Sequence, residues 1–148
     1  MLIIICITIL ASLIMGKSIE SQLEKLKNID WRKETSQLFD KINKYAIKAG
    51  RVASHPILQF YYVLTDADTT VTEKAMIYAA IIYTVLPISL IPQSVFKFLG
   101  IFDEGAAVIF VYKKIKSKIT PEINSKVDNT INDWFGVEYK DIKTDANK

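Results

Sequence analysis

Two pairs of carboxylates are the residues whose type and spacing could support chemistry. Asp103 and Glu104 are adjacent, and Asp66 and Asp68 are separated by one residue. Paired carboxylates can bind a cation, or exchange protons where their surroundings separate their pKa values. Helix capping and turn formation would also explain both pairs. We therefore treat a cation- or proton-binding activity at Asp103 and Glu104 as an alternative function.

Other reactive side chains are scarce. Cys6 is the one cysteine and His55 the one histidine, which excludes an internal disulfide and any motif that needs two of either residue. The net charge of +3 is too small to favour a nucleic-acid partner, and the sequence has no glycine-rich phosphate loop. We expect Cys6 to fill apolar space and His55 to lie at the surface or a helix end. The sequence therefore favours a non-enzymatic protein, with no catalytic residue, cofactor or metal.

The elements that must position these residues are predicted to be helices. The chain has 148 residues, enough for one domain, and half of them are hydrophobic. Its mean hydropathy of +0.19 raises the possibility of membrane segments, and no stretch shows the alternation typical of strands. The predicted fold is all-α, with an N-terminal apolar membrane helix followed by a small helical domain that contains a proline-bounded helical hairpin.

The first fifteen residues carry no charged side chain. A helix of this length spans roughly 22 Å, short of the roughly 30 Å of a hydrocarbon core, but local thinning of the bilayer would allow it to cross. We expect an uncleaved membrane anchor over residues 1–16. A cleaved signal segment is the second interpretation, although no basic residue precedes the apolar run. A core helix is the third, because an apolar helix at a chain terminus rarely has a partner that buries it.

The next stretch is polar and contains an amphipathic helix. Its apolar residues follow helical spacing: Leu38, Ile42, Tyr45, Ala49 and Val52. Lysines 41, 44 and 48 on its polar side could lie on an anionic membrane or simply face solvent. Gly50 is predicted to mark a break after this helix, and Pro56 is predicted to open a short helix over residues 57–64.

An uncharged run over residues 75–91 is the second membrane candidate. The Thr70-Val-Thr-Glu73 capping box predicts that a helix begins just before it. A second arm over residues 101–112 would complete a hairpin over 75–112, which could span, enter or avoid the bilayer. We single out five residues of this hairpin as candidate functional positions: Pro87, Pro92, Gly100, Asp103 and Glu104.

The last helix has clear boundary residues. Thr120 is the expected N-cap, Pro121 the first helical residue and Gly136 the stop. Its apolar stripe consists of Ile123, Val127, Ile131 and Trp134.

Changes in composition predict four parts of the chain. These are a membrane anchor or signal segment at 1–16, a polar helical linker at 17–38, a helical domain at 39–136 and a polar tail at 137–148. Lysines and arginines follow the first apolar segment and flank the hairpin on both sides. Because such residues tend to stay cytoplasmic, we expect a membrane protein whose main domain faces the cytoplasm.

The hairpin also carries a family resemblance. Residues 83–93 read YTVLPISLIPQ and residues 98–104 read FLGIFDE. The sequence over about residues 39–136 resembles the YkvA-like family, a bacterial domain of unknown function, which implies a small helical, membrane-associated protein without an established activity. The chain departs from the family pattern at Ser89 and Gln93, which occupy aspartate positions, and at Glu104, which replaces another aspartate.

We therefore expect an uncharacterised membrane-associated helical protein that binds membrane lipid or another membrane protein. Besides the carboxylate activity at Asp103 and Glu104, an exported helical domain released by signal cleavage is an alternative.

Overall fold

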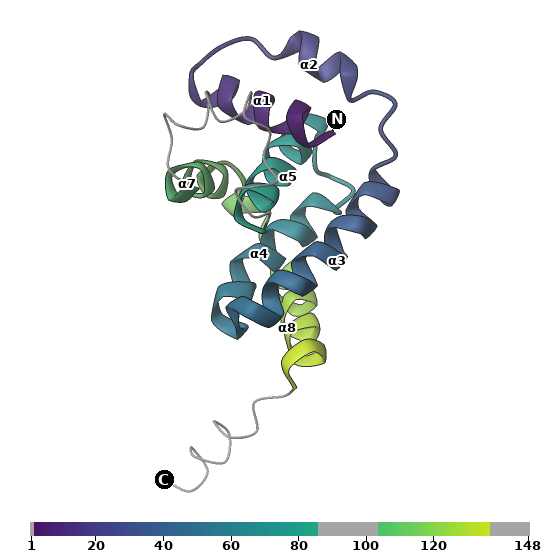
Figure 1. Cartoon of the computed structure of the whole chain (residues 1–148), viewed down its shortest axis with the longest axis vertical. Helices are drawn as coiled ribbons and strands as arrows, with labels where there is room; N and C mark the ends of the chain where they lie inside the picture. The colour runs from purple at the N-terminus through teal and green to yellow at the C-terminus, as the bar shows by residue number, and fades with distance from the viewer. Residues whose placement is uncertain (1, 86–103, 137–148) are drawn as a thin grey trace, which may run out of the picture.

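The structure is a computed structural model that describes residues 2–85 and 104–136 of the chain (Figure 1). Within these residues the chain is helical and contains no strand, which confirms the predicted all-α class. The helices are α1 (Leu2–Ile14), α2 (Glu20–Lys25), α3 (Trp31–Ala49), α4 (Arg51–Leu64), α5 (Val71–Val85), α7 (Glu104–Ile115), the 3₁₀ helix η2 (Lys116–Lys118) and α8 (Pro121–Phe135).

Helix α5 occupies the centre of the bundle. It contacts α1, α3, α4 and α7, and all eight residues from Ala75 to Ile82 are buried. A helix that is apolar on every side needs such an environment, because any face left in water would expose apolar area. Its start is fixed by the predicted capping box: Thr70 Oγ1 accepts from the Glu73 N–H at 3.2 Å, and Glu73 Oε1 accepts from the Thr70 N–H at 2.9 Å.

Helix α1 packs on α5 (Figure 1). Cys6, Ile7 and Ile9 are at most 1% exposed and belong to the same apolar core as α5. Within residues 2–85 and 104–136, no helix combines the length and the apolar character that crossing a membrane requires. The expected N-terminal membrane helix is therefore not supported. The partner that buries α1 lies about 70 residues further along the chain, which is why sequence proximity did not indicate it.

The break between α3 and α4 occurs at Gly50, as predicted, where φ is +94°. The prediction that Pro56 opens a helix over 57–64 is wrong, because α4 begins at Arg51 and contains Pro56. Pro56 lies in the second turn, where its missing N–H removes only the bond to the Val52 carbonyl. Because the chain changes direction at Gly50, Val52 is 87% exposed and does not continue the apolar stripe of α3.

Helix α8 matches its predicted boundaries and packs against α4. Thr120 Oγ1 accepts from the Ile123 N–H at 3.2 Å, and Pro121 is the first helical residue. Trp134 from α8 contacts Phe39 of α3, with ring centroids 5.2 Å apart. This aromatic contact joins the last helix to the α3–α4 layer.

The predicted hairpin lies partly outside the described residues. Four of its candidate residues lie outside the described residues: Pro87, Pro92, Gly100 and Asp103. Glu104 begins α7, and only its backbone is described. The expected linker at 17–38 contains α2 and the first part of α3, and α3 continues without a break past residue 38. The division of the chain into four parts stays a prediction.

Candidate functional site

The outward side of α1 forms the first candidate surface. Helical spacing places five half-buried residues on this side, which we name the α1 outer face: Ile4, Ile5, Thr8, Ser12 and Met15. The Thr8 hydroxyl donates to the Ile4 carbonyl at 2.7 Å, so that its proton has a partner within the helix. The outer face therefore offers apolar surface without any charged group.

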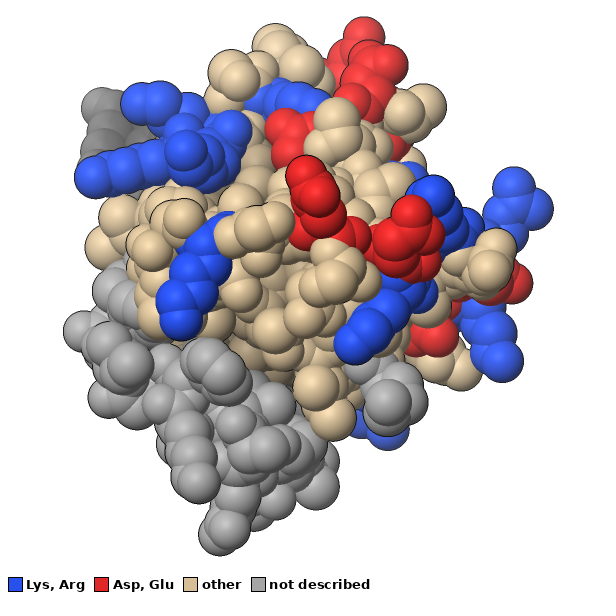
Figure 2. Space-filling view, turned by 90° about the horizontal axis from the view of Figure 1, so that it is seen from above, with Lys and Arg blue, Asp and Glu red and all other residues tan. Residues whose placement is uncertain are grey.

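The charges at this end of the molecule lie at the edges of the uncharged area. Figure 2, which views the end that bears α1 and α2, shows tan surface in the middle with Lys, Arg, Asp and Glu side chains around it. Lys17 is exposed three residues after the end of α1, and Lys25 and Lys27 are exposed at the end of α2. Lys27 pairs with Glu24 at 2.9 Å, which leaves Lys17 and Lys25 without a carboxylate partner among the described residues.

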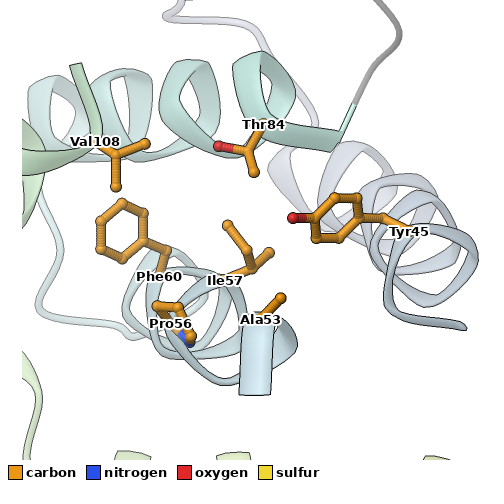
Figure 3. A pocket seen from close by; sticks show the side chains of 7 residues that line it. All are labelled: Tyr45, Ala53, Pro56, Ile57, Phe60, Thr84 and Val108. Carbon is orange, nitrogen blue, oxygen red and sulfur yellow. The ribbon is translucent and has the colours of Figure 1, made fainter. Parts of the chain in front are cut away.

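A groove between α3, α4, α5 and α7 forms the second candidate site (Figure 3). It encloses about 450 Å³, within the range of small-molecule sites. We name it the α4 groove, because α4 supplies most of its lining: Tyr45, Ala53, Pro56, Ile57, Phe60, Thr84 and Val108. Ile57 and Phe60 are 4% and 1% exposed and anchor the groove in the core.

Two hydroxyls interrupt this apolar lining. Figure 3 shows the Tyr45 hydroxyl pointing into the groove from α3, and the Thr84 hydroxyl pointing along α5 toward the side that bears Val108. The Thr84 hydroxyl donates to the Ala80 carbonyl at 3.0 Å, which leaves its oxygen as an acceptor. The Tyr45 hydroxyl has no partner among the described residues and can donate. The groove therefore combines an apolar wall with a hydrogen-bond donor at its α3 side and an acceptor on α5.

An ion pair connects the start of α5 to η2. Lys118 Nζ lies 2.5 Å from Glu73 Oε1 and donates to the Asp68 carbonyl at 3.1 Å. Burial opposes ionisation of Glu73, but the hydrogen bonds from Lys118 and Thr70 outweigh it and hold the pKa of this carboxyl below its usual value. This contact fixes the chain before α8 to the central helix. Oε1 of this carboxylate therefore takes part in both the capping box and the ion pair.

Of the two acidic pairs, Asp66 and Asp68 lie in the part of the chain that the structure describes, and they belong to no cation site there. Asp66 Oδ1 accepts from the Asp68 N–H at 2.9 Å, which is the turn chemistry considered as the alternative. No group of three or more His, Cys, Asp and Glu side chains gathers within residues 2–85 and 104–136. Asp103 and the Glu104 side chain lie outside the described residues, so their proposed activity stays a prediction.

The two single-copy residues have ordinary surroundings. Cys6 is fully buried between α1 and α5, and burial, with a smaller contribution from Glu34, raises the pKa of its thiol. His55 lies inside α4 rather than at a helix end, with 43% of its side chain exposed, 3.9 Å from Asp128. Neither residue points to catalysis.

Comparison with known proteins adds a partial family match. Residues 73–110 match the model of a family described as "Protein of unknown function (DUF1232)". This segment, about a quarter of the chain, supports a relationship to an uncharacterised family, and it does not confirm the YkvA-like name. Neither the curated proteins nor the solved structures contain a match. Thr84 and Val108 of the α4 groove lie within the matched segment.

Sequence reasoning did not identify the α4 groove. Tyr45 was assigned to an apolar stripe and Thr84 to an uncharged arm, and neither assignment indicates a cavity. The groove arises from four helices whose relative positions are set by tertiary packing. The one available signal was a hydroxyl in an otherwise apolar segment, at Thr84.

Proposed function

We propose that this chain is a non-enzymatic protein that binds peripherally to an anionic membrane, with the α1 outer face turned toward the lipid. Its site of action would be the cytoplasmic surface of the bacterial inner membrane. The observation that carries the proposal is that α1 is apolar on every side while only one side of it packs on α5. The other side has no charged group that would have to be desolvated on entering the interface.

Electrostatics supports the same orientation. Lys17 is exposed three residues after the end of α1, and Lys25 is exposed at the end of α2, a helix that contacts α1. Each lysine close to an anionic leaflet contributes about 1 kcal/mol, and the attraction falls off within a Debye length. We therefore expect both the apolar face and the basic edge to contribute to binding.

Vesicle flotation tests this proposal. The full-length chain is mixed with unilamellar vesicles of phosphatidylcholine and phosphatidylglycerol, and the fraction that floats is measured. Ile5→Glu places a charge on the α1 outer face, and Ile47→Glu makes the same change on α3, where Ile47 is 69% exposed. We expect the wild-type chain and Ile47→Glu to float and Ile5→Glu to stay in the dense fraction. Both variants must first show wild-type helicity by circular dichroism.

The outcomes separate the proposal from its rivals. Absence of flotation by the folded wild-type chain would overturn it, and so would equal losses in Ile5→Glu and Ile47→Glu. Vesicles of phosphatidylcholine alone should bind more weakly, because they lack the anionic headgroups that attract Lys17 and Lys25. Resistance to extraction by high salt and by carbonate would show that the chain is inserted as an integral membrane protein, and the proposal of peripheral binding would be wrong.

A further inference from the structure

We propose that the α4 groove binds the chain of an anionic single-chain amphiphile, specifically a long-chain carboxylate. This inference is independent of membrane binding by the α1 outer face. It rests on the shape and lining of the groove, on its two hydroxyls and on the charges beside it.

The lining selects an apolar ligand. Ala53, Ile57 and Phe60 present aliphatic and aromatic surface from successive turns of α4, and Val108 adds to it from α7 (Figure 3). A volume of about 450 Å³ is ample for a flexible hydrocarbon chain. Each methylene group that leaves water for such a wall contributes about 0.8 kcal/mol. The groove is therefore suited to a chain of several methylene groups.

The hydroxyls select a polar head at one end of that chain. The Tyr45 hydroxyl is available as a donor, and the Thr84 oxygen remains an acceptor because its proton is used by the Ala80 carbonyl. The Tyr45 hydroxyl lies on the α3 side of the groove, away from Val108, and the Thr84 hydroxyl lies on α5 between Tyr45 and Val108. A carboxylate oxygen can accept from the Tyr45 hydroxyl, and a bound water can link it to Thr84.

The charges beside Tyr45 select an anion. Lys41 and Lys48 are one turn before and one turn after Tyr45, which places both on the same side of α3. Neither forms an ion pair with a carboxylate among the described residues. A carboxylate at the Tyr45 hydroxyl would therefore lie between two ammonium groups, whereas a cationic head would be repelled by them.

Calorimetric titration with dodecanoate below its micelle concentration tests the proposal. We expect saturable binding by the full-length chain, and at least tenfold weaker binding of dodecyltrimethylammonium, which has the same chain and the opposite charge. Ala53→Phe fills the groove and should weaken dodecanoate binding at least tenfold. Ala49→Phe is the matched control, because Ala49 is exposed at the end of α3 and does not line the groove.

Two further variants keep the test decisive. Tyr45→Phe retains the ring and removes the donor, so that it should fold normally and weaken binding of dodecanoate severalfold. Ile5→Glu should bind dodecanoate as the wild type does, which separates this site from membrane binding. Absence of saturable binding by the wild type would overturn the proposal. So would equal affinity for the two amphiphiles, or equal losses in Ala53→Phe and Ala49→Phe.

Discussion

Helices α1 and α5 belong to the same core, but protein encloses them to different extents. Helix α1 is apolar on every side, and so is α5 after its first turn, which holds Glu73 and Lys74. Four other helices enclose α5, so that eight consecutive residues are buried. Helix α1 covers one side of α5 and leaves its own outer face half-buried. The hydrophobicity of a helix therefore indicates that its surface must be shielded from water. The fold determines whether other helices shield all of that surface.

A buried charge provides the strongest test of this contrast. Ile81 of α5 is fully buried, and Ile81→Glu would place a carboxylate where the core offers it no partner. The cost of several kcal/mol is a large part of the total stability of about 5–15 kcal/mol expected for a domain. We expect Ile81→Glu to lose cooperative thermal unfolding in circular dichroism. Ile5 is half-buried against the core, so Ile5→Glu should cost less stability than Ile81→Glu and leave cooperative unfolding in place. Equal effects of the two substitutions would show that the helices are equally enclosed.

Truncation of the inner side of α1 tests whether this helix is part of the core. Ile9 is 0% exposed and belongs to the same core cluster as the α5 residues. Ile9→Ala should lower the free energy of unfolding by about 2–5 kcal/mol, through lost burial and the cavity left behind. Chemical denaturation measures this loss. Ile47→Ala is the control, because its exposed side chain should contribute within about 0.5 kcal/mol. A negligible effect of Ile9→Ala would place α1 outside the bundle.

Removal of the cap at the start of α5 should have a smaller effect on stability. Thr70→Ala removes the side-chain oxygen that accepts from the Glu73 N–H, and should destabilise the domain by about 1 kcal/mol. Denaturation midpoints of the wild type and of Thr70→Ala measure this difference. Thr65→Ala provides the control: its hydroxyl is exposed and bonds only the Tyr62 carbonyl, so we expect little change.

The pH dependence of stability identifies the contribution of Glu73. Its pKa is lower in the folded chain than its usual value of 4.5, so ionised Glu73 stabilises the fold above that pH. The stabilisation is lost as the pH falls below 4.5 and passes through the folded pKa. We expect Glu73→Gln to lose this part of the acid sensitivity, seen as a smaller fall in denaturation midpoint between pH 5 and pH 3. An unchanged acid profile would show that the pair with Lys118 contributes nothing measurable.

The sequence predicted those elements whose ends have local chemical signals. Thr70 and Glu73 at the start of α5, and Thr120, Pro121 and Gly136 around α8, form the contacts expected of them. Gly50 likewise ends α3 as expected. Each of these signals depends on residues within four positions of one another, so a sequence pattern is sufficient to predict it.

The sequence did not predict features that depend on distant residues. Pro56 was expected to open a helix, but α4 begins at Arg51, where the Ser54 N–H donates to the Gly50 carbonyl and Ser54 is buried. Helix α1 was expected in a membrane, because its partner α5 begins about 55 residues after α1 ends. The α4 groove required the positions of four helices at once. The candidate residues from Pro87 to Asp103 lie outside the described residues.

The reactivity of Cys6 toward a water-soluble thiol reagent tests most directly whether α1 belongs to the bundle. Cys6 lies fully buried on the inner side of α1, and burial raises the pKa of its thiol, which suppresses the reactive thiolate. The measurement uses the full-length, detergent-free, monodisperse chain at neutral pH, with the urea-unfolded chain as the reference rate. We predict negligible labelling of the folded chain until the denaturant reaches the unfolding transition. Labelling of the folded chain at the rate of the unfolded one would contradict the packing of α1 on α5.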